Sequence, residues 1–140
     1  MKNKSAFTLI ELLVVIAIIG LLATLSVLAL NNARAKSRDT KRISDIKQMQ
    51  TALELYFNDA SAYPTSVGAG GSITSYNSST GATTTYMQMV PTPPTPPTEI
   101  TQYTYELITG AGASYTLEYC LEGSVATLAA GCHTATNSAL

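Results

Sequence analysis

The stretch that decides the fold is "SAFTLIELLVVIAIIG", residues 5–20, an apolar run with one charged residue, Glu11. The apolar character continues beyond it, and the sequence from Leu12 to Leu30 contains no charged side chain. A helix of that length crosses a hydrocarbon core of about 30 Å. A carboxylate in such surroundings costs about 2.5–3.5 kcal/mol on insertion, so Glu11 calls for a partner. The stretch therefore predicts a membrane-spanning helix with a functionally important acid near its N-terminal end.

Two other interpretations of this segment stay open on the residues alone. A secretory signal peptide would explain Lys2, Lys4 and the small residues Ala33 and Ala35, but the apolar run is longer than the usual core of such signals. A plain signal anchor fits the length and leaves Glu11 unexplained. The topology is also undecided, because the positive charges after the segment favour a cytoplasmic C-terminal side and the paired cysteines favour the outside.

The pattern after Ala33 predicts that the same helix continues in amphipathic form. Apolar residues recur there at spacings of three and four, which places them on one helical face: Ile43, Ile46, Met49, Leu53, Tyr56, Phe57 and Ala60. The charged residues Arg42 and Asp45 are expected off that face. Because no proline precedes Pro64, we expect one helix from about Phe7 to about Asp59, roughly 80 Å long at 1.5 Å per residue.

The head, residues 63–140, begins with two segments that predict little core. Residues 65–85 are rich in glycine, serine and threonine, which predicts a long exposed loop. The proline run at 91–97 predicts a stiff, extended polyproline II spacer. Neither segment is expected to contribute a strand.

Strands are expected only near the end of the chain, over about residues 101–129. Tyrosine and leucine alternate with polar residues at 102–108 and at 114–122, which predicts an antiparallel hairpin, and a short third strand is expected at 125–129. A hairpin alone is marginal in water, so its apolar face needs a partner. The fold class is therefore α+β, with the small antiparallel sheet packed on the amphipathic half of the helix.

Charge and cysteine placement narrow what the head can bind. All eight lysines and arginines lie at or before Lys47, and six of the nine acids follow it, so the head cannot neutralise phosphates and direct nucleic-acid binding is not expected. Cys120 and Cys132 are too few for a tetrahedral zinc site, and they predict one disulfide worth about 3 kcal/mol in an oxidising compartment. Two unpaired cysteines are the alternative.

The sequence shows none of the residue combinations that are typical of catalytic sites. His133 is the single histidine, in a glycine- and threonine-rich tail, where we expect it to be solvated. A Ser/His/Asp set, a glycine-rich phosphate loop and a clustered carboxylate pair are all missing from the sequence. We therefore expect no enzymatic activity and no cofactor, with a membrane-anchored enzyme as the weaker alternative.

Two quoted stretches resemble one family. "FTLIELLVVIAIIGLLAT", residues 7–24, behind a short lysine-containing leader, resembles the N-terminus of type IV pilins and type II secretion pseudopilins. "RISDIKQMQTALELYFNDASAYPT", residues 42–65, resembles the helix end of the major pseudopilin and of short pilins. The resemblance implies that a prepilin peptidase cuts between Ala6 and Phe7 and methylates the new amino group of Phe7. Mature chains would leave the inner membrane through an assembly platform and pack helix to helix into a homo-oligomeric filament with the head outside.

The resemblance divides the chain and gives Glu11 a role. It implies a leader at 1–6, a transmembrane or filament-core half of the helix at 7–33, and an amphipathic half at 34–62. Cleavage creates a positive amino group on Phe7, four residues before Glu11. That amine would pair with Glu11 in its own chain or a neighbour, whereas before cleavage only Lys4 is near enough to be considered.

The chain departs from the family pattern at three places. Ala6 stands where glycine usually precedes the cut, and Leu28 stands where many relatives have the proline at which the helix loosens on assembly. The region after Pro97 has scattered Glu and no Asp, so the calcium site of the major pseudopilins is not expected and we predict no metal.

The resemblance implies a structural subunit of a type IV pilus or pilus-like filament. It would be a single-pass protein of the cytoplasmic membrane and then part of an extracellular filament. A major-type pseudopilin of a type II secretion system is the alternative, and a DNA-uptake pilin is a weaker one.

Overall fold

The structure is a computed structural model that describes residues 7–96, 102–109 and 114–137. The expected leader, residues 1–6 with Ala6, lies outside the described residues. The chain divides into two compact units, residues 1–35 and residues 36–140. One helix, α1 (Leu9–Ala60), contributes to both, which confirms the continuous helix expected from the sequence.

The described part of the first unit is a helix that buries none of its side chains. Every residue from Phe7 to Arg34 is exposed, although most of them are apolar. By length and composition this helix can cross a membrane. Its hydroxyl groups are satisfied internally, because Thr24 Oγ1 donates to the carbonyl of Leu21 at 2.8 Å and Ser26 Oγ to that of Leu22 at 2.8 Å. The segment is therefore built for apolar surroundings that lipid or other helices must supply.

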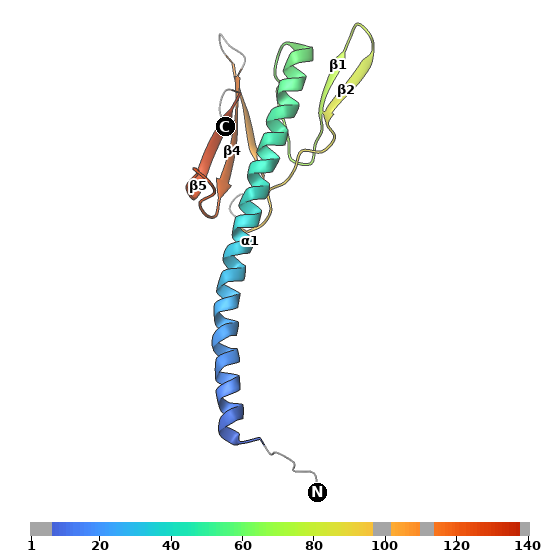
Figure 1. The fold of residues 1–140 in the computed structure, drawn as a ribbon. Helices are drawn as coiled ribbons and strands as arrows, with labels where there is room; N and C mark the ends of the chain where they lie inside the picture. Colours follow the sequence, from blue (N-terminus) through green and yellow to red (C-terminus); the bar gives the residue numbers. More distant parts are fainter. Residues whose placement is uncertain (1–6, 97–101, 110–113, 138–140) are drawn as a thin grey trace. The chain divides into compact units, whose positions relative to one another are not determined.

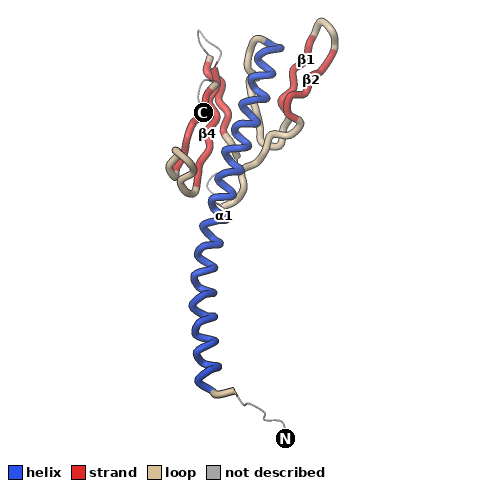
Figure 2. Tube along the Cα trace, in the orientation of Figure 1, coloured by secondary structure: helices blue, strands red, loops and turns tan. Residues whose placement is uncertain are grey.

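The second unit packs the C-terminal part of α1 against a three-stranded antiparallel sheet with the order β3-β4-β5 (Figure 1). The sheet consists of β3 (Thr104–Ile108), β4 (Ser114–Leu121) and β5 (Gly131–Thr136). A separate antiparallel hairpin is formed by β1 (Ile73–Asn77) and β2 (Ala82–Met87) (Figure 2). The predicted α+β class is confirmed, and so is the pairing of the strands near 102–108 and 114–122.

The core lies between the helix stripe and the inner face of the sheet. From the helix, Ile46, Met49 and Leu53 are at most 1% exposed. The sheet contributes alternate residues of β4, each of them buried: Tyr115, Leu117, Tyr119 and Leu121. This is the tyrosine and leucine face that period-two alternation predicts, and it covers the stripe that helical spacing predicts.

Residues 65–85 do not form the expected loop. They contain β1 and most of β2, which are joined by a turn in which the Asn77 side-chain Oδ1 accepts bonds from the backbone amides of Ser79 (2.9 Å) and Thr80 (3.2 Å). Gly81 closes the turn with a φ of 69°, a conformation that glycine adopts freely. The β-branched threonines favour strands, and the prediction counted them only as polar. Exposure was predicted better than structure, because nearly all of this hairpin except Ile73 is solvent-accessible.

The expected third strand at 125–129 is also wrong. Val125 and Leu128 form only an isolated bridge, with paired backbone hydrogen bonds of 2.9 and 3.0 Å across a turn. Ala126 there has a φ of 52°, which an extended strand does not allow. The third strand is β5, further along the chain. The described part of the proline segment, residues 91–96, forms neither helix nor strand, and Pro97 lies outside the described residues.

Candidate functional site

The helix begins at a capping box in which Glu11 takes part. Thr8 precedes the helix, and its backbone amide and hydroxyl both donate to Glu11 Oε2, at 2.9 and 2.6 Å. In return the Glu11 amide donates to Thr8 Oγ1 at 3.3 Å. These bonds satisfy amides that every helix N-terminus leaves without an intrahelical partner. Glu11 therefore has a hydrogen-bonding partner in Thr8, which was not expected from the sequence, while Lys4, the one cation considered near it before cleavage, lies outside the described residues.

The capping box leaves room for the role that the resemblance gave Glu11. The hydrogen bonds that the Glu11 carboxylate accepts from described residues both end on Oε2, so Oε1 stays available to a further donor. Phe7 lies just before the cap and is 77% exposed. A carboxylate at a helix N-terminus is favoured by the helix dipole. Cap and amine can thus share one carboxylate, and the pairing of Phe7 with Glu11 stays a prediction.

A buried cluster of ion pairs lies on the middle of α1, within the second unit. Arg42 and Asp39 are 2% and 1% exposed, and Arg42 Nη1 donates to Asp39 Oδ1 at 2.5 Å. The same nitrogen donates to Glu122 Oε1 at 2.8 Å. Arg38 donates two hydrogen bonds to Glu122, from Nε to Oε1 at 2.7 Å and from Nη2 to Oε2 at 2.5 Å. We call these four residues (Arg38, Asp39, Arg42 and Glu122) the ion-pair cluster.

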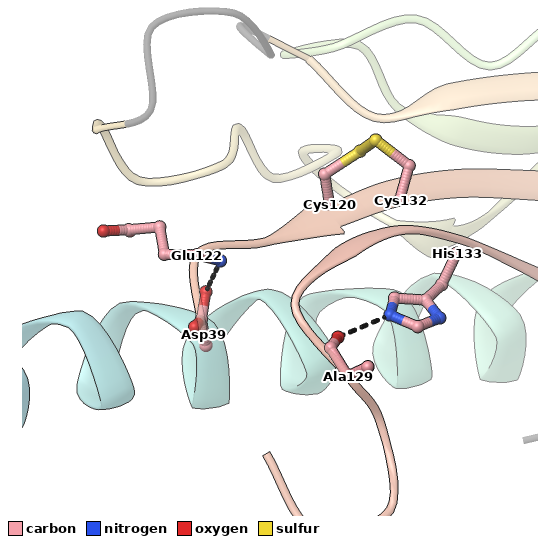
Figure 3. Close-up of a disulfide and its surroundings, with 6 residues drawn as sticks. All are labelled: Asp39, Cys120, Glu122, Ala129, Cys132 and His133. Carbon is pink, nitrogen blue, oxygen red and sulfur yellow. Dashed lines mark hydrogen bonds between the residues drawn. A yellow bond between two sulfur atoms is a disulfide. The ribbon is translucent and has the colours of Figure 1, made fainter. Parts of the chain in front are cut away.

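The ion-pair cluster attaches two distant chain segments to the helix. Asp39 accepts bonds from the backbone amides of Glu122 at 2.9 Å and Gly123 at 2.8 Å, at the turn after β4 (Figure 3). Arg42 donates to the carbonyl of Pro94 at 2.6 Å and also to that of Pro96. Buried charges are tolerated when they are paired and fully hydrogen-bonded. The cluster therefore fixes both the sheet and the proline segment on one helical turn.

Neighbouring polar groups extend this arrangement. Asp45, 6% exposed, accepts a bond of 2.9 Å from the buried hydroxyl of Tyr103. Burial, together with the Asp45 carboxylate, raises the pKa of Tyr103. The bidentate bond from Arg38, supported by Arg42, lowers the pKa of Glu122. The arginines thus favour the ionised form of Glu122, whereas burial and Asp45 favour the protonated form of Tyr103.

The placement of Arg42 and Asp45 corrects the sequence prediction, which put both off the buried face. A signal was present, because Asp39 and Arg42 continue the spacing of three and four that leads to Ile46, Met49 and Leu53. Two opposite charges three residues apart on the buried stripe indicate a buried pair. The partner, Glu122, is far away in sequence and carried no local signal.

The predicted disulfide is confirmed. Cys120 and Cys132 are bonded and stand opposite each other on the paired strands β4 and β5 (Figure 3). His133, expected in a solvated tail, instead belongs to β5, where its Nε2 lies 2.8 Å from the Ala129 carbonyl oxygen and its ring packs near Tyr119. Within the described ranges no group of three His, Cys, Asp or Glu residues could hold a metal ion.

The N-terminal part of the chain is similar to known proteins. Residues 1–27 match the family model described as the prokaryotic N-terminal methylation motif. Type II secretion system core protein G of Aeromonas hydrophila is 42% identical over 64 residues, 46% of this chain and 45% of that protein. The protein of the same name from Vibrio cholerae is 38% identical over 65 residues, 46% of this chain and 44% of that one.

A fimbrial relative is similar to the same degree. A probable minor fimbrial protein of Dichelobacter nodosus is 37% identical over 70 residues, 50% of this chain and 42% of that protein. The chain thus spans less than half the length of these relatives. No solved structure matches. The resemblance of the N-terminal segment to pilins and pseudopilins is confirmed.

Proposed function

We propose that this chain, with its N-terminal methylation motif of the pilin and pseudopilin type, is a structural subunit of a type IV pilus or pilus-like filament. The observation that carries the proposal is the exposed apolar helix with Glu11 in the capping box at its start. A helix that buries none of its apolar residues is incomplete alone, and lipid first and neighbouring helices later would complete it.

Processing would change what surrounds Glu11. Removal of the leader after Ala6 by a prepilin peptidase would place a methylated, positively charged nitrogen on Phe7, beside the capping box. Glu11 Oε1 would accept this group, from its own chain or from a neighbour. Charge pairing is stronger in the low dielectric of packed helices than in water. The amine would therefore draw a new subunit into register with the filament.

The head would be a rigid domain, because several bonds connect its segments. The ion-pair cluster and the disulfide each connect helix or strand segments that are distant in sequence. A disulfide persists in an oxidising compartment, which supports a head on the outer side of the cytoplasmic membrane. We propose no enzymatic activity and no cofactor for this chain, and its partners would be other copies, the peptidase and a membrane assembly platform.

Two kinds of filament fit this subunit. The exposed hairpin of β1 and β2, rich in serine and threonine, favours a surface pilus. The names of the relatives in Aeromonas hydrophila and Vibrio cholerae favour a secretion pseudopilus, although the matched half is the helix rather than the head. We propose the surface pilus first and the pseudopilus second. Direct DNA binding is not proposed, because no lysine or arginine follows Lys47.

Electron microscopy of cells tests the proposal. Long surface fibres should be present in the wild type, absent without the gene, and restored when it is returned. A secretion defect without loss of fibres would move the subunit to the pseudopilus. Wild-type levels of both fibres and secretion in the deletion strain would reject both.

Substitutions at Glu11 separate its two roles. Glu11→Gln keeps a side chain that can cap the helix and removes the charge, whereas Glu11→Ala removes both. We expect both variants to enter the membrane and to yield at least tenfold fewer fibres. Normal fibres from Glu11→Gln would show that capping, and not ion pairing, is what Glu11 provides.

A further inference from the structure

The charged side chains of the second unit that contact no described partner separate into two groups. Most acids in the described second unit are engaged: Asp39 and Glu122 with arginine, and Asp45, Glu54 and Asp59 with tyrosine hydroxyl groups. Glu106 and Glu118 make no such contact with any described residue. Among the cations, the same holds for Lys36, Lys41 and Lys47, all of them exposed on α1.

The two glutamates lie on the outer face of the sheet. Register places Glu106 opposite Thr116 and Glu118 opposite Thr104, with threonines of β5 completing both rows. The opposite face of β4 is the buried tyrosine and leucine face. Glu106 and Glu118 are therefore diagonal neighbours on a polar surface, with about 7–8 Å between their Cα atoms. We call this surface the acidic face.

In an isolated chain, the two carboxylates of the acidic face have no neighbouring cation among the described residues. At physiological ionic strength charges are screened over about 8 Å, so these two carboxylates still repel each other. No cation can come from the same sheet, because every lysine and arginine lies at or before Lys47. A cation brought by a partner between the two carboxylates would remove the repulsion and gain attraction.

We propose that the acidic face binds the exposed lysines of α1 from a second copy of this chain. We call these lysines (Lys36, Lys41 and Lys47) the lysine band. The inference rests on the proposed function, since a filament places many copies side by side. Charge complementarity identifies the partner: the unpaired lysines of the described second unit are on the helix, and the sheet carries two carboxylates that no described residue contacts. Such pairing sets orientation and register more than raw affinity.

Mixing two opposite variants tests the pairing between copies. E106K/E118K reverses the acidic face and K41E/K47E reverses the lysine band. We expect each variant alone to yield at least tenfold fewer sheared fibres than the wild type. Expressed together they should restore fibres that contain both, because the reversed face of one then meets the reversed band of the other. Pairing within a single chain could not be rescued by mixing.

A control removes the effect of net charge. E106Q/E118Q and T83K/T85K shift the net charge equally, but Thr83 and Thr85 are exposed on β2, away from the acidic face. We expect fewer fibres only from E106Q/E118Q, with thermal unfolding of every variant unchanged. If mixing fails to restore fibres, or if the single variants assemble normally while Glu11→Ala does not, the docking surface is overturned and the filament function stands. If the wild-type chain forms no filament, the proposed function itself is overturned.

Discussion

Arg42→Met isolates the contribution of the ion-pair cluster to the stability of the head. Methionine keeps much of the apolar stem of Arg42 and removes the guanidinium. Asp39, 1% exposed, then loses its cation but keeps the amides of Glu122 and Gly123. The carbonyls of Pro94 and Pro96 lose the donor that Arg42 supplies.

The expected loss of unfolding free energy is about 3–5 kcal/mol, the usual cost of removing one partner from a buried ion pair. A domain of this size has a total of about 5–15 kcal/mol. The melting temperature should therefore fall by about 12–40 °C, since 1 kcal/mol corresponds to roughly 4–8 °C for a domain of this size. Arg38→Met should cost only about 1 kcal/mol, because the Arg38 side chain is 25% exposed.

Tyrosine near-ultraviolet circular dichroism of the full chain in detergent measures these losses, since the chain has eight tyrosines and no tryptophan. Lys41→Met is the matched control: it removes an exposed cation one residue away and should stay within about 0.5 kcal/mol of the wild type. A loss below about 1 kcal/mol for Arg42→Met would refute the view that the buried pair holds the sheet and the proline segment on the helix.

Three further predictions concern the head. Replacing Cys120 and Cys132 together by serine should cost about 3 kcal/mol in urea unfolding, and an unchanged midpoint would contradict this. Acid should destabilise the head, because Arg38 and Arg42 bind the Glu122 carboxylate and hold its pKa below the ordinary 4.5. The contribution of Glu122 to stability is present above about pH 4.5 and is lost as the pH falls through the lowered pKa. Glu122→Gln should therefore flatten this part of the profile of melting temperature against pH. Tyr103→Phe leaves the buried Asp45 without its tyrosine donor and should cost about 1–3 kcal/mol in calorimetry. Tyr76→Phe, at an exposed tyrosine of β1, should stay within about 0.5 kcal/mol of the wild type; equal losses would contradict the assignment.

Periodicity predicted what local physics determines. The helix from Leu9 to Ala60, the buried stripe around Ile46 and Leu53, and the alternating face of β4 follow from spacing alone. The disulfide followed from cysteine count and compartment. The helix, the buried stripe and the strand face could be predicted because the pattern of each one repeats within a short window of sequence.

The features that the prediction missed depend on residues far apart in sequence or on competing local signals. The ion-pair cluster joins Arg42 to Glu122, which are 80 residues apart in sequence, and polarity alone indicated an exposed arginine. The β1 and β2 hairpin was missed because threonine is both polar and β-branched, and the strand preference prevails when Asn77 and Gly81 supply the turn. The cap at Thr8 and Glu11 was a local signal that went unused.

Mass spectrometry of the mature N-terminus, on chains recovered from sheared surface fibres, tests the central claim most directly. Cleavage after Ala6 and methylation create the group that Glu11 is proposed to bind. The account predicts a chain that begins at Phe7 with a methylated amino group. A mature chain that begins near Lys36, as an ordinary signal peptide would leave, or one that still carries Met1, would contradict it.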